Sequence, residues 1–135
     1  MQRKVSYLKS TEVVVDLKNN KYMEEKTVKV TVKDIAQSPL KLRLVANVVR
    51  GKNAQEAIEL LSILNKKGAS SIKKAVLSGV ASARDLYSAS PEDLTIDKIV
   101  VDEAKILKRT RCESRGRVSR IDKRRSHLNL ELTVK

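Results

Sequence analysis

Hydrophobic and polar residues alternate along two stretches of this chain, a pattern typical of β-strands with one buried face. In residues 27–33 three valines alternate with lysine and threonine. Residues 128–134 alternate in the same way, and residues 96–102 form a third β-prone run. We expect these three segments to pair as a small antiparallel sheet.

Three other stretches have the three- and four-residue spacing of amphipathic helices. The first is expected to begin at Ser38, whose hydroxyl would cap it, with Pro39 in the first turn. It would run to Arg50, before Gly51. Its expected buried stripe is Leu42, Val45, Ala46 and Val49.

The second and third helices follow directly. The second is expected after Asn53, with Glu56 at the spacing of a capping box, and would end at 65–68. The third covers about four turns before Pro91 and has small residues on its apolar stripe, which favours close packing. The expected buried positions are Ala57, Leu60, Leu61 and Leu64 in the second helix, and Ile72, Ala75, Val76, Gly79, Val80, Ala83, Leu86 and Tyr87 in the third.

These elements predict an α+β fold, in which three helices pack on an antiparallel sheet of about three strands with a long basic β-hairpin extension. Residues 26–135 are expected to form one globular RNA-binding domain, including an extended hairpin at 104–127. Residues 1–25 are interpreted as an N-terminal extension, in which 12–18 is a candidate accessory strand.

The basic residues are concentrated in this hairpin. The sequence has 29 Lys and Arg against 16 Asp and Glu, a formal net charge of +13. Residues 105–127 alone contain ten basic and two acidic residues, with Gly116 near the middle. One side of the hairpin, from Lys105 to Arg115, could extend roughly 35 Å. A segment with so much like charge needs a polyanion, and the charge density favours a phosphate backbone.

The composition disfavours several other functions. Phe and Trp are absent and there are three Tyr, so stacking of bases on aromatic rings is not expected. No apolar run approaches the ~20 residues that span a bilayer, and the first 20 residues are a poor match to a signal peptide. The basic residues are not arranged on one face of an amphipathic helix, so no membrane partner is expected.

No catalytic, metal or cofactor site is predicted. The chain has one histidine, one cysteine and no glycine-rich phosphate loop. His127 lacks a signalled nucleophile or orienting partner, so we expect it to have a structural or RNA-binding role. Cys112 lies beside Arg111 and could be a reactive thiol, but an incidental loop position is the favoured interpretation.

Several segments, in the same order, resemble a known family. Residues 38–52, SPLKLRLVANVVRGK, are similar to the S-P-x-K-x-R-L-V-x-x-x-x-R-G-K helix of the large-subunit ribosomal protein L twenty-two family. The N-K-[KR]-G-A turn of that family matches 65–69, and its V-D-E strand end matches 101–103. Its hairpin motifs K-R, [KR]-G-R and K-R-x-S-H match 108–109, 115–117 and 123–127. The resemblance covers residues 27–134.

The resemblance implies a structural constituent of the large ribosomal subunit rather than an enzyme. Such a protein binds large-subunit rRNA, supports assembly and lines the peptide exit tunnel with its hairpin tip. The implied partners are this rRNA, neighbouring ribosomal proteins and the nascent polypeptide, with no membrane partner and no homo-oligomer. The implied location is a cytoplasmic ribosome, with an organellar one left open.

The charge of the hairpin and the resemblance together give two sets of expected site residues. The expected rRNA-binding residues are Lys41, Arg43, Arg50, Lys52, Lys66, Lys67, Lys105, Lys108, Arg109, Arg111, Arg115, Arg117, Arg120, Lys123, Arg124, Arg125, Ser126 and His127. The expected tunnel-lining tip is Lys108, Arg109, Thr110, Arg111, Cys112, Glu113, Ser114, Arg115 and Gly116.

Two features depart from the family pattern. The family commonly has P-R-A where this chain has residues 112–114, Cys-Glu-Ser, which leaves the tip conformation open. Residues 1–25 also extend beyond the usual start. The alternative function is a free-standing regulator that binds nucleic acid through a helix-turn-helix-like pair at 38–68. The concentration of charge on the hairpin, away from these helices, disfavours it.

Overall fold

The fold is a three-stranded antiparallel sheet with three helices on one face. A computed structural model describes residues 26–135, and the predictions for residues 1–25 lie outside them. The elements, in order, are β1 (Thr27–Ile35), α1 (Pro39–Val49), α2 (Ala54–Ile63), α3 (Lys67–Tyr87), η1 (Pro91–Asp93), β2 (Leu94–Cys112), η2 (Ser114–Gly116) and β3 (Val118–Val134). The predicted α+β fold class is confirmed.

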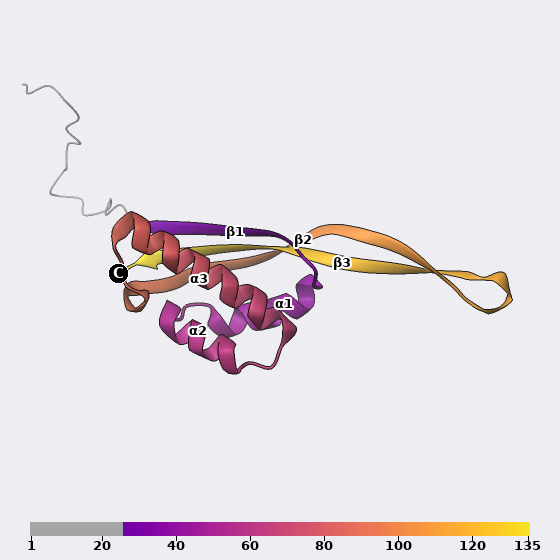
Figure 1. Ribbon diagram of the computed structural model, residues 1–135, viewed down its shortest axis with the longest axis horizontal. Helices are drawn as coiled ribbons and strands as arrows, with labels where there is room; N and C mark the ends of the chain where they lie inside the picture. The colour runs from indigo at the N-terminus through magenta and orange to yellow at the C-terminus, as the bar shows by residue number, and fades with distance from the viewer. Residues whose placement is uncertain (1–25) are drawn as a thin grey trace, which may run out of the picture.

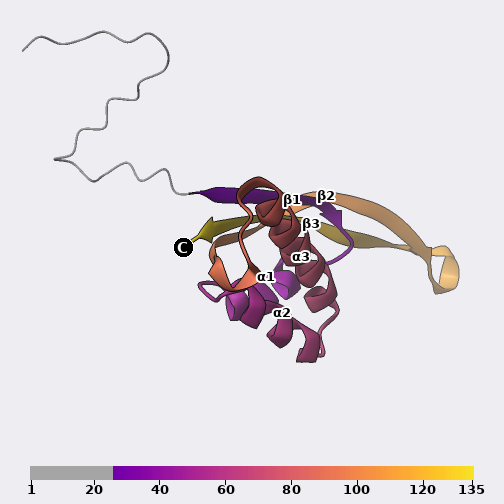
Figure 2. The same ribbon diagram turned by 60° about the vertical axis from the view of Figure 1, so that its left-hand side comes forward.

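The strands are arranged in the order β1-β3-β2, with both neighbours antiparallel to the central β3. β2 and β3 continue as a two-stranded ribbon far beyond the part of the sheet that the helices cover (Figure 1). Figure 2 shows the same ribbon projecting away from the helices after the view is turned. We call the ribbon, residues 105–124, the arm, and the remaining described residues the body.

The core lies between the sheet and the helices. Leu128, Leu130 and Leu132 alternate along β3 and are buried under α1 and α3. Gly79 of α3 permits close approach, because a Cβ there would overlap Leu132 Cδ1 and lie 3.2 Å from Val30 Cγ2. Removal of these aliphatic side chains from water is the main force that holds the two layers together.

α2 ends at Ile63 rather than at the predicted 65–68, and Lys67 and Gly68 instead begin α3, which is 21 residues long. The predicted caps are present only in part. Ser38 and Pro39 begin α1 as predicted, but the Ser38 side chain makes no capping hydrogen bond. Asn53 caps α2 by accepting from the backbone N–H of Gln55 at 3.0 Å. The predicted capping box at Glu56 is not among the hydrogen bonds of residues 26–135, whereas Ser90 forms such a box at η1.

Three residues predicted to be buried are exposed, namely Leu60, Leu86 and Tyr87. The last turn of α3 lies at the β1 edge of the sheet, where no further strand among the described residues covers it (Figure 1). Tyr87 instead packs beside Lys26, whose Nζ lies 5.8 Å from the ring centre. Helical periodicity identified the correct face of α3, but it could not show where the sheet ends.

Candidate nucleic-acid interface

The arm is a regular ribbon with no buried residue. Its pairs run from Leu107 opposite Lys123 to Cys112 opposite Val118, and every arm residue is exposed or half-buried. At the usual rise per residue, the strand from Lys105 to Cys112 extends about 25 Å from the body. Backbone pairing therefore holds the arm together with little help from a hydrophobic core.

Most of the arm's positive charge has no acidic partner. Of the ten basic residues in 105–127, Arg120 is paired with Asp122 at 2.9 Å and Arg125 with Asp34. The other acidic residue of the segment, Glu113, accepts a hydrogen bond from the Ser119 hydroxyl at 2.7 Å. Eight basic side chains have no ion pair within residues 26–135, namely Lys105, Lys108, Arg109, Arg111, Arg115, Arg117, Lys123 and Arg124.

The tip is a tight turn between Cys112 and Val118. Arg115 and Gly116 both have positive φ, 59° and 72°, and the backbone N–H of Glu113 donates to the Arg117 carbonyl at 2.8 Å. Because left-handed conformations favour glycine, Gly116 suits this turn and Arg115 carries a modest conformational cost. The Cys-Glu-Ser sequence at 112–114 is thus compatible with a closed hairpin.

Two β-bulges mark the place where the arm leaves the body. On β2 the register shifts between Ala104 and Leu107, and on β1 it shifts between Val32 and Ile35. Each shift inserts one extra residue opposite β3, which bends a strand and increases its twist. The extra residue in β1 is associated with Asp34, which has a φ of 61°.

Asp34 and its neighbours attach the root of the arm to the body. The Asp34 carboxylate accepts from the Arg125 guanidinium, and its backbone N–H donates to His127 Nδ1 at 3.0 Å. Ser126 is completely buried, and its hydroxyl donates to the Gln37 carbonyl at 3.1 Å. We call this group of contacts, from Asp34 and Gln37 to residues 125–127, the root latch.

A basic cleft lies beside the root latch. The cleft has a volume of about 600 Å³ and lies between the start of α1, the start of α3 and the arm. Its basic lining residues are Lys41, Lys67, Lys123, Arg124 and Arg125, with Asp122 as the acidic one. The structure therefore gathers predicted site residues from three distant parts of the sequence around one concave surface.

Two predicted site residues on α1 hold the helix against the edge of the sheet. Arg43 donates from Nε and Nη2 to the Val101 carbonyl, at 3.2 and 3.0 Å. Arg50 donates from Nη2 to the Ile99 carbonyl at 3.0 Å. These bonds satisfy carbonyls of the edge strand β2 that would otherwise be left to water. Both residues thus have a structural task, whatever else their remaining N–H groups contact.

Lys52 and Lys66 lie outside the basic cleft. Lys52 is half-buried after α1, and Lys66 is exposed before α3. Neither forms an ion pair within residues 26–135. Their assignment to rRNA remains a prediction.

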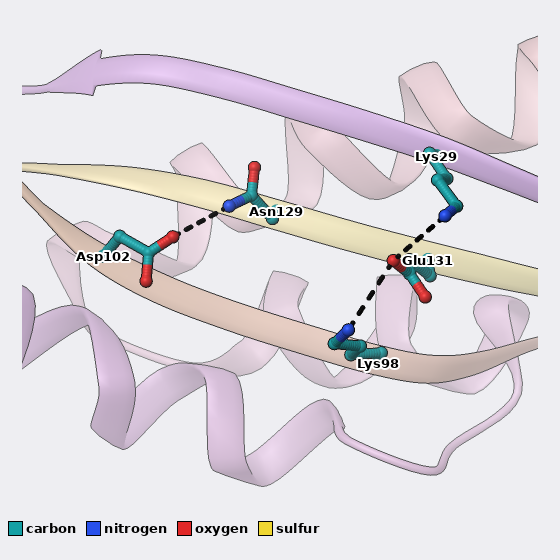
Figure 3. Close-up of polar contacts among 5 residues, drawn as sticks. All are labelled: Lys29, Lys98, Asp102, Asn129 and Glu131. Atoms are coloured by element: carbon teal, nitrogen blue, oxygen red, sulfur yellow. Dashed lines mark hydrogen bonds and ion pairs between the residues drawn. The ribbon is translucent and has the colours of Figure 1, made fainter.

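The sheet face opposite the helices is balanced in charge. Lys29 of β1 and Lys98 of β2 both lie near the same oxygen of Glu131 on β3, at 3.6 and 3.8 Å (Figure 3). Asn129 donates to Asp102 at 2.9 Å on the same face. These contacts thus bring together two lysines and two carboxylates, unlike the charges of the arm.

Neither a membrane-spanning helix nor a metal-binding cluster is found within the described residues. No helix in 26–135 combines the length and apolar character needed to cross a membrane. The same part of the chain has no group of three or more His, Cys, Asp or Glu side chains arranged to hold a metal ion.

The fold and the interface together define a small α+β protein with a projecting ribbon of unpaired basic residues. The chain belongs to the family described as ribosomal protein L22p/L17e, whose model matches residues 30–133. It is similar to a large ribosomal subunit protein uL22 of Dehalococcoides mccartyi, with 45% identity over 103 residues, covering 76% of this chain and 94% of the relative. A uL22 protein of Herpetosiphon aurantiacus is 43% identical over 102 residues, covering 76% and 90%. The family resemblance seen in the motifs is confirmed.

Sequence reasoning missed the body side of the root latch. Asp34 and Gln37 were not among the predicted site residues, although they bind the segment 125–127. The available signal was the interruption of the alternating pattern at Lys33 and Asp34, which is where the bulge forms. Leu107 also lines the basic cleft. Because its side chain is apolar, its residue type could not indicate this position.

Proposed function

We propose that this protein is a structural constituent of the large ribosomal subunit that binds large-subunit rRNA and supports subunit assembly in the cytoplasmic ribosome. The observation that carries the proposal is the set of eight basic arm residues that have no acidic partner within residues 26–135. Like charges at this density oppose a free ribbon, and two-stranded ribbons are marginal on their own. Phosphates on both sides of the arm would neutralise the charge and stabilise the ribbon.

The contacts divide into a root and a tip. At the root, the basic cleft offers lysines and arginines from α1, α3 and β3 to one stretch of phosphate backbone. Ser126 is left out of this interface because it is completely buried and already bonded to Gln37. Arg125 and His127 are proposed to act mainly by fixing the root, because both bind Asp34.

The tip, residues 108–116, is proposed to line the peptide exit tunnel and face the nascent polypeptide. The support for this assignment is the position of the tip at the far end of the arm, together with the family to which the chain belongs (Figure 1). The Arg115–Gly116 turn gives the tip a narrow end that could reach through densely packed RNA. Neighbouring ribosomal proteins are proposed as further partners, with one copy of this chain in each subunit and no catalytic step.

The arrangement of α2 and α1 disfavours the helix-turn-helix alternative. The second helix of such a pair reads base edges with polar side chains, but α2 exposes the acidic Glu56 and Glu59, and Gln55 donates to Glu59 at 2.8 Å. The first helix would cross the phosphate backbone. The arginines Arg43 and Arg50 are instead bonded to carbonyls of β2. Leu40, Leu44 and Val48 occupy an exposed face of the helix, and they cannot make the hydrogen bonds that distinguish bases.

The proposal is tested by the salt dependence of binding to large-subunit rRNA. With on the order of 6–10 phosphates contacted, log affinity should fall with log salt at a slope of several units. Titrations of the full-length protein at several salt concentrations would give this slope. A slope near zero would contradict the phosphate contacts, whereas a steep one in the presence of competing non-ribosomal RNA would support them.

A second experiment separates root from tip. Replacing Cys112 and Glu113 by alanine should leave incorporation into large subunits intact while altering nascent-chain stalling or macrolide sensitivity. Reversing the charge at Lys123 and Arg124 should impair incorporation, because these residues line the basic cleft. Sedimentation of subunits from cells that carry each variant measures incorporation. Failed incorporation of the tip variant together with normal incorporation of the root variant would reverse this division.

A further inference from the structure

An apolar groove lies next to the basic cleft on the helical side of the body. It runs between α1 and the connection from α2 to α3, with a volume of about 430 Å³. Leu44, Val45, Val48 and Leu64 supply its apolar lining, and Lys41, Lys66 and Lys67 supply its charged lining. Gln37, Lys41 and Lys67 also line the basic cleft, so the two hollows are adjacent.

The groove exposes aliphatic surface that the fold does not use. Leu44 is 70% exposed and Val48 42%, on the side of α1 away from the buried stripe. Leu40, one turn before Leu44 on the same face, is 63% exposed. Three aliphatic residues at i, i+4 and i+8 form a continuous stripe along a helix. Contiguous exposed apolar surface with a polar rim is typical of a protein interaction site.

RNA is a poor occupant for this groove. RNA offers phosphates, ribose hydroxyls and base edges, and splayed bases are usually held by aromatic rings or arginine planes. The lining contains neither an aromatic residue nor an arginine. The lysines at its edge can contact phosphates from the side of the basic cleft, but the aliphatic floor matches apolar side chains.

The charges at the groove select the kind of protein that fits. Three lysines and no acidic residue line it, so a partner segment with acidic residues beside its apolar anchors would be complementary. A second copy of this chain would place the same lysines against one another, and the chain has a net charge of +13. Self-association through this face is therefore unfavourable.

We propose that the groove between α1 and the α2–α3 connection binds an acidic segment of a neighbouring protein of the large subunit, anchored by an apolar side chain against Leu44 and Val48. The segment would lie beside the rRNA in the basic cleft, with Lys41 and Lys67 between the two partners. The surface would thus join one protein and one RNA strand to the same end of the helical layer. This inference rests on the proposed assembly of the chain into the large subunit.

The test uses a single reactive cysteine placed in the groove. In a full-length Cys112→Ser background, Leu44→Cys is labelled with a maleimide in the free protein, in a complex with large-subunit rRNA alone, and in purified large subunits. We expect Leu44→Cys to react at similar rates in the free protein and in the rRNA complex. In the large subunit the reaction should be at least tenfold slower. Leu86→Cys in the same background, at an equally exposed position on the last turn of α3, is the matched control for general loss of access.

Each other outcome has a definite meaning. Protection in the free protein would show that the chain covers its own groove, and protection by rRNA alone would show that RNA is the occupant. Rapid labelling in the subunit would show that nothing binds there. Any of the three overturns the proposal. If the Leu44→Cys variant fails to enter subunits while the Leu86→Cys variant enters normally, the proposal is supported, because only the first substitution changes the groove.

The acidic character of the partner is tested separately. A carbodiimide, which joins an amine directly to a carboxylate, should link Lys66 to an Asp or Glu of a second protein in intact subunits. Mass spectrometry would identify the linked pair, and Lys66→Arg should abolish it. If subunits contain the protein but Lys66 is linked to no carboxylate of another protein, the proposal of an acidic partner segment is overturned. If the wild-type protein fails to co-sediment with subunits at all, the proposed function fails instead.

Discussion

The ladder of β2 and β3 passes through two regions that differ in what stabilises them. The body contains the pairs from Leu94 opposite Val134 to Ala104 opposite Arg125, and there every second residue of β3 from Ser126 to Leu132 is buried. In the arm the same backbone pairing continues, but no residue is buried. The bulge between Ala104 and Leu107 separates the two regions.

The charges differ in the same way. On the open face of the body, Lys29 and Lys98 share Glu131, whereas eight basic residues of the arm have no acidic partner in the part of the chain that the structure describes. The buried core stabilises the body, whereas we propose that the arm needs a ligand that supplies negative charge. A ligand that binds only the ordered ribbon stabilises it by mass action. Continuous strand pairing therefore does not imply a continuous source of stability.

The largest difference is expected when one aliphatic residue is truncated in each region. Leu130→Ala removes a side chain that is 1% exposed in the body, and should cost about 2–5 kcal/mol of unfolding free energy. Val118→Ala removes one that is 62% exposed in the arm, and should change stability by less than about 0.5 kcal/mol. Urea denaturation of the full-length variants measures both. Equal losses would mean that the arm has a packed core of its own.

The next largest difference concerns RNA affinity. Lys123→Gln with Arg124→Gln removes two positive charges from the arm, and should lower the magnitude of the salt slope for rRNA binding by about 2. Lys29→Gln with Lys98→Gln removes the same charge from the balanced face, and should change the slope much less. The two double variants have the same net charge, so any difference between their salt slopes reports where the removed charges lie. Equal changes in slope would show that overall charge, rather than the arm, governs binding.

Much of the body could be predicted from the sequence because its pattern is repetitive. The alternation in β1 and β3 and the spacing in α3 each report a buried face, and those faces meet in the core. The charge of the arm was equally visible, because composition alone locates it. The fold of the body and the position of the charge therefore follow from residue type and order.

The root of the arm could not be predicted, because it depends on single contacts rather than on a pattern. Ser126 was expected to bind RNA, but it is buried and bonded to Gln37. A serine can take either role, so the residue type alone could not distinguish them. Arg43 was expected at the RNA and bonds to a carbonyl of β2. Both contacts join residues more than 50 positions apart in sequence, so they exist only once the sheet has formed.

A smaller effect is expected where the two regions join. Asp34→Gly keeps the positive φ accessible but removes the carboxylate that binds Arg125. Stability should change by less than about 1 kcal/mol, while the direction of the arm should become less defined. Spin labels on Cys112 and on a cysteine introduced at the exposed Ser78 would report the distribution of tip-to-body distances. We expect a broader distribution in Asp34→Gly and an unchanged one in Asp97→Asn, an exposed acidic position away from the latch.

That experiment also distinguishes a hinge from a fixed arm. If the distribution in Asp34→Gly stays as narrow as in the parent protein, the bulges and backbone pairing alone set the direction of the arm. His127 and Ser126 would then provide sufficient attachment without the ion pair.

The smallest effect is expected on the balanced face. Glu131→Gln leaves Lys29 and Lys98 without their shared carboxylate, but both lysine side chains are well exposed, so water and salt screen them. Exposed ion pairs contribute about 0–1 kcal/mol, so unfolding free energy should fall by no more than this, and the loss should shrink as salt is raised. The variant gains one positive charge at a place where we expect no RNA, so its rRNA affinity should rise only slightly through the general field. Urea denaturation and rRNA titration at low and high salt measure the two quantities. An increase in affinity as large as the decrease from removing one arm charge would show that this face also contacts RNA, and the contrast between a self-sufficient body and a ligand-dependent arm would no longer hold.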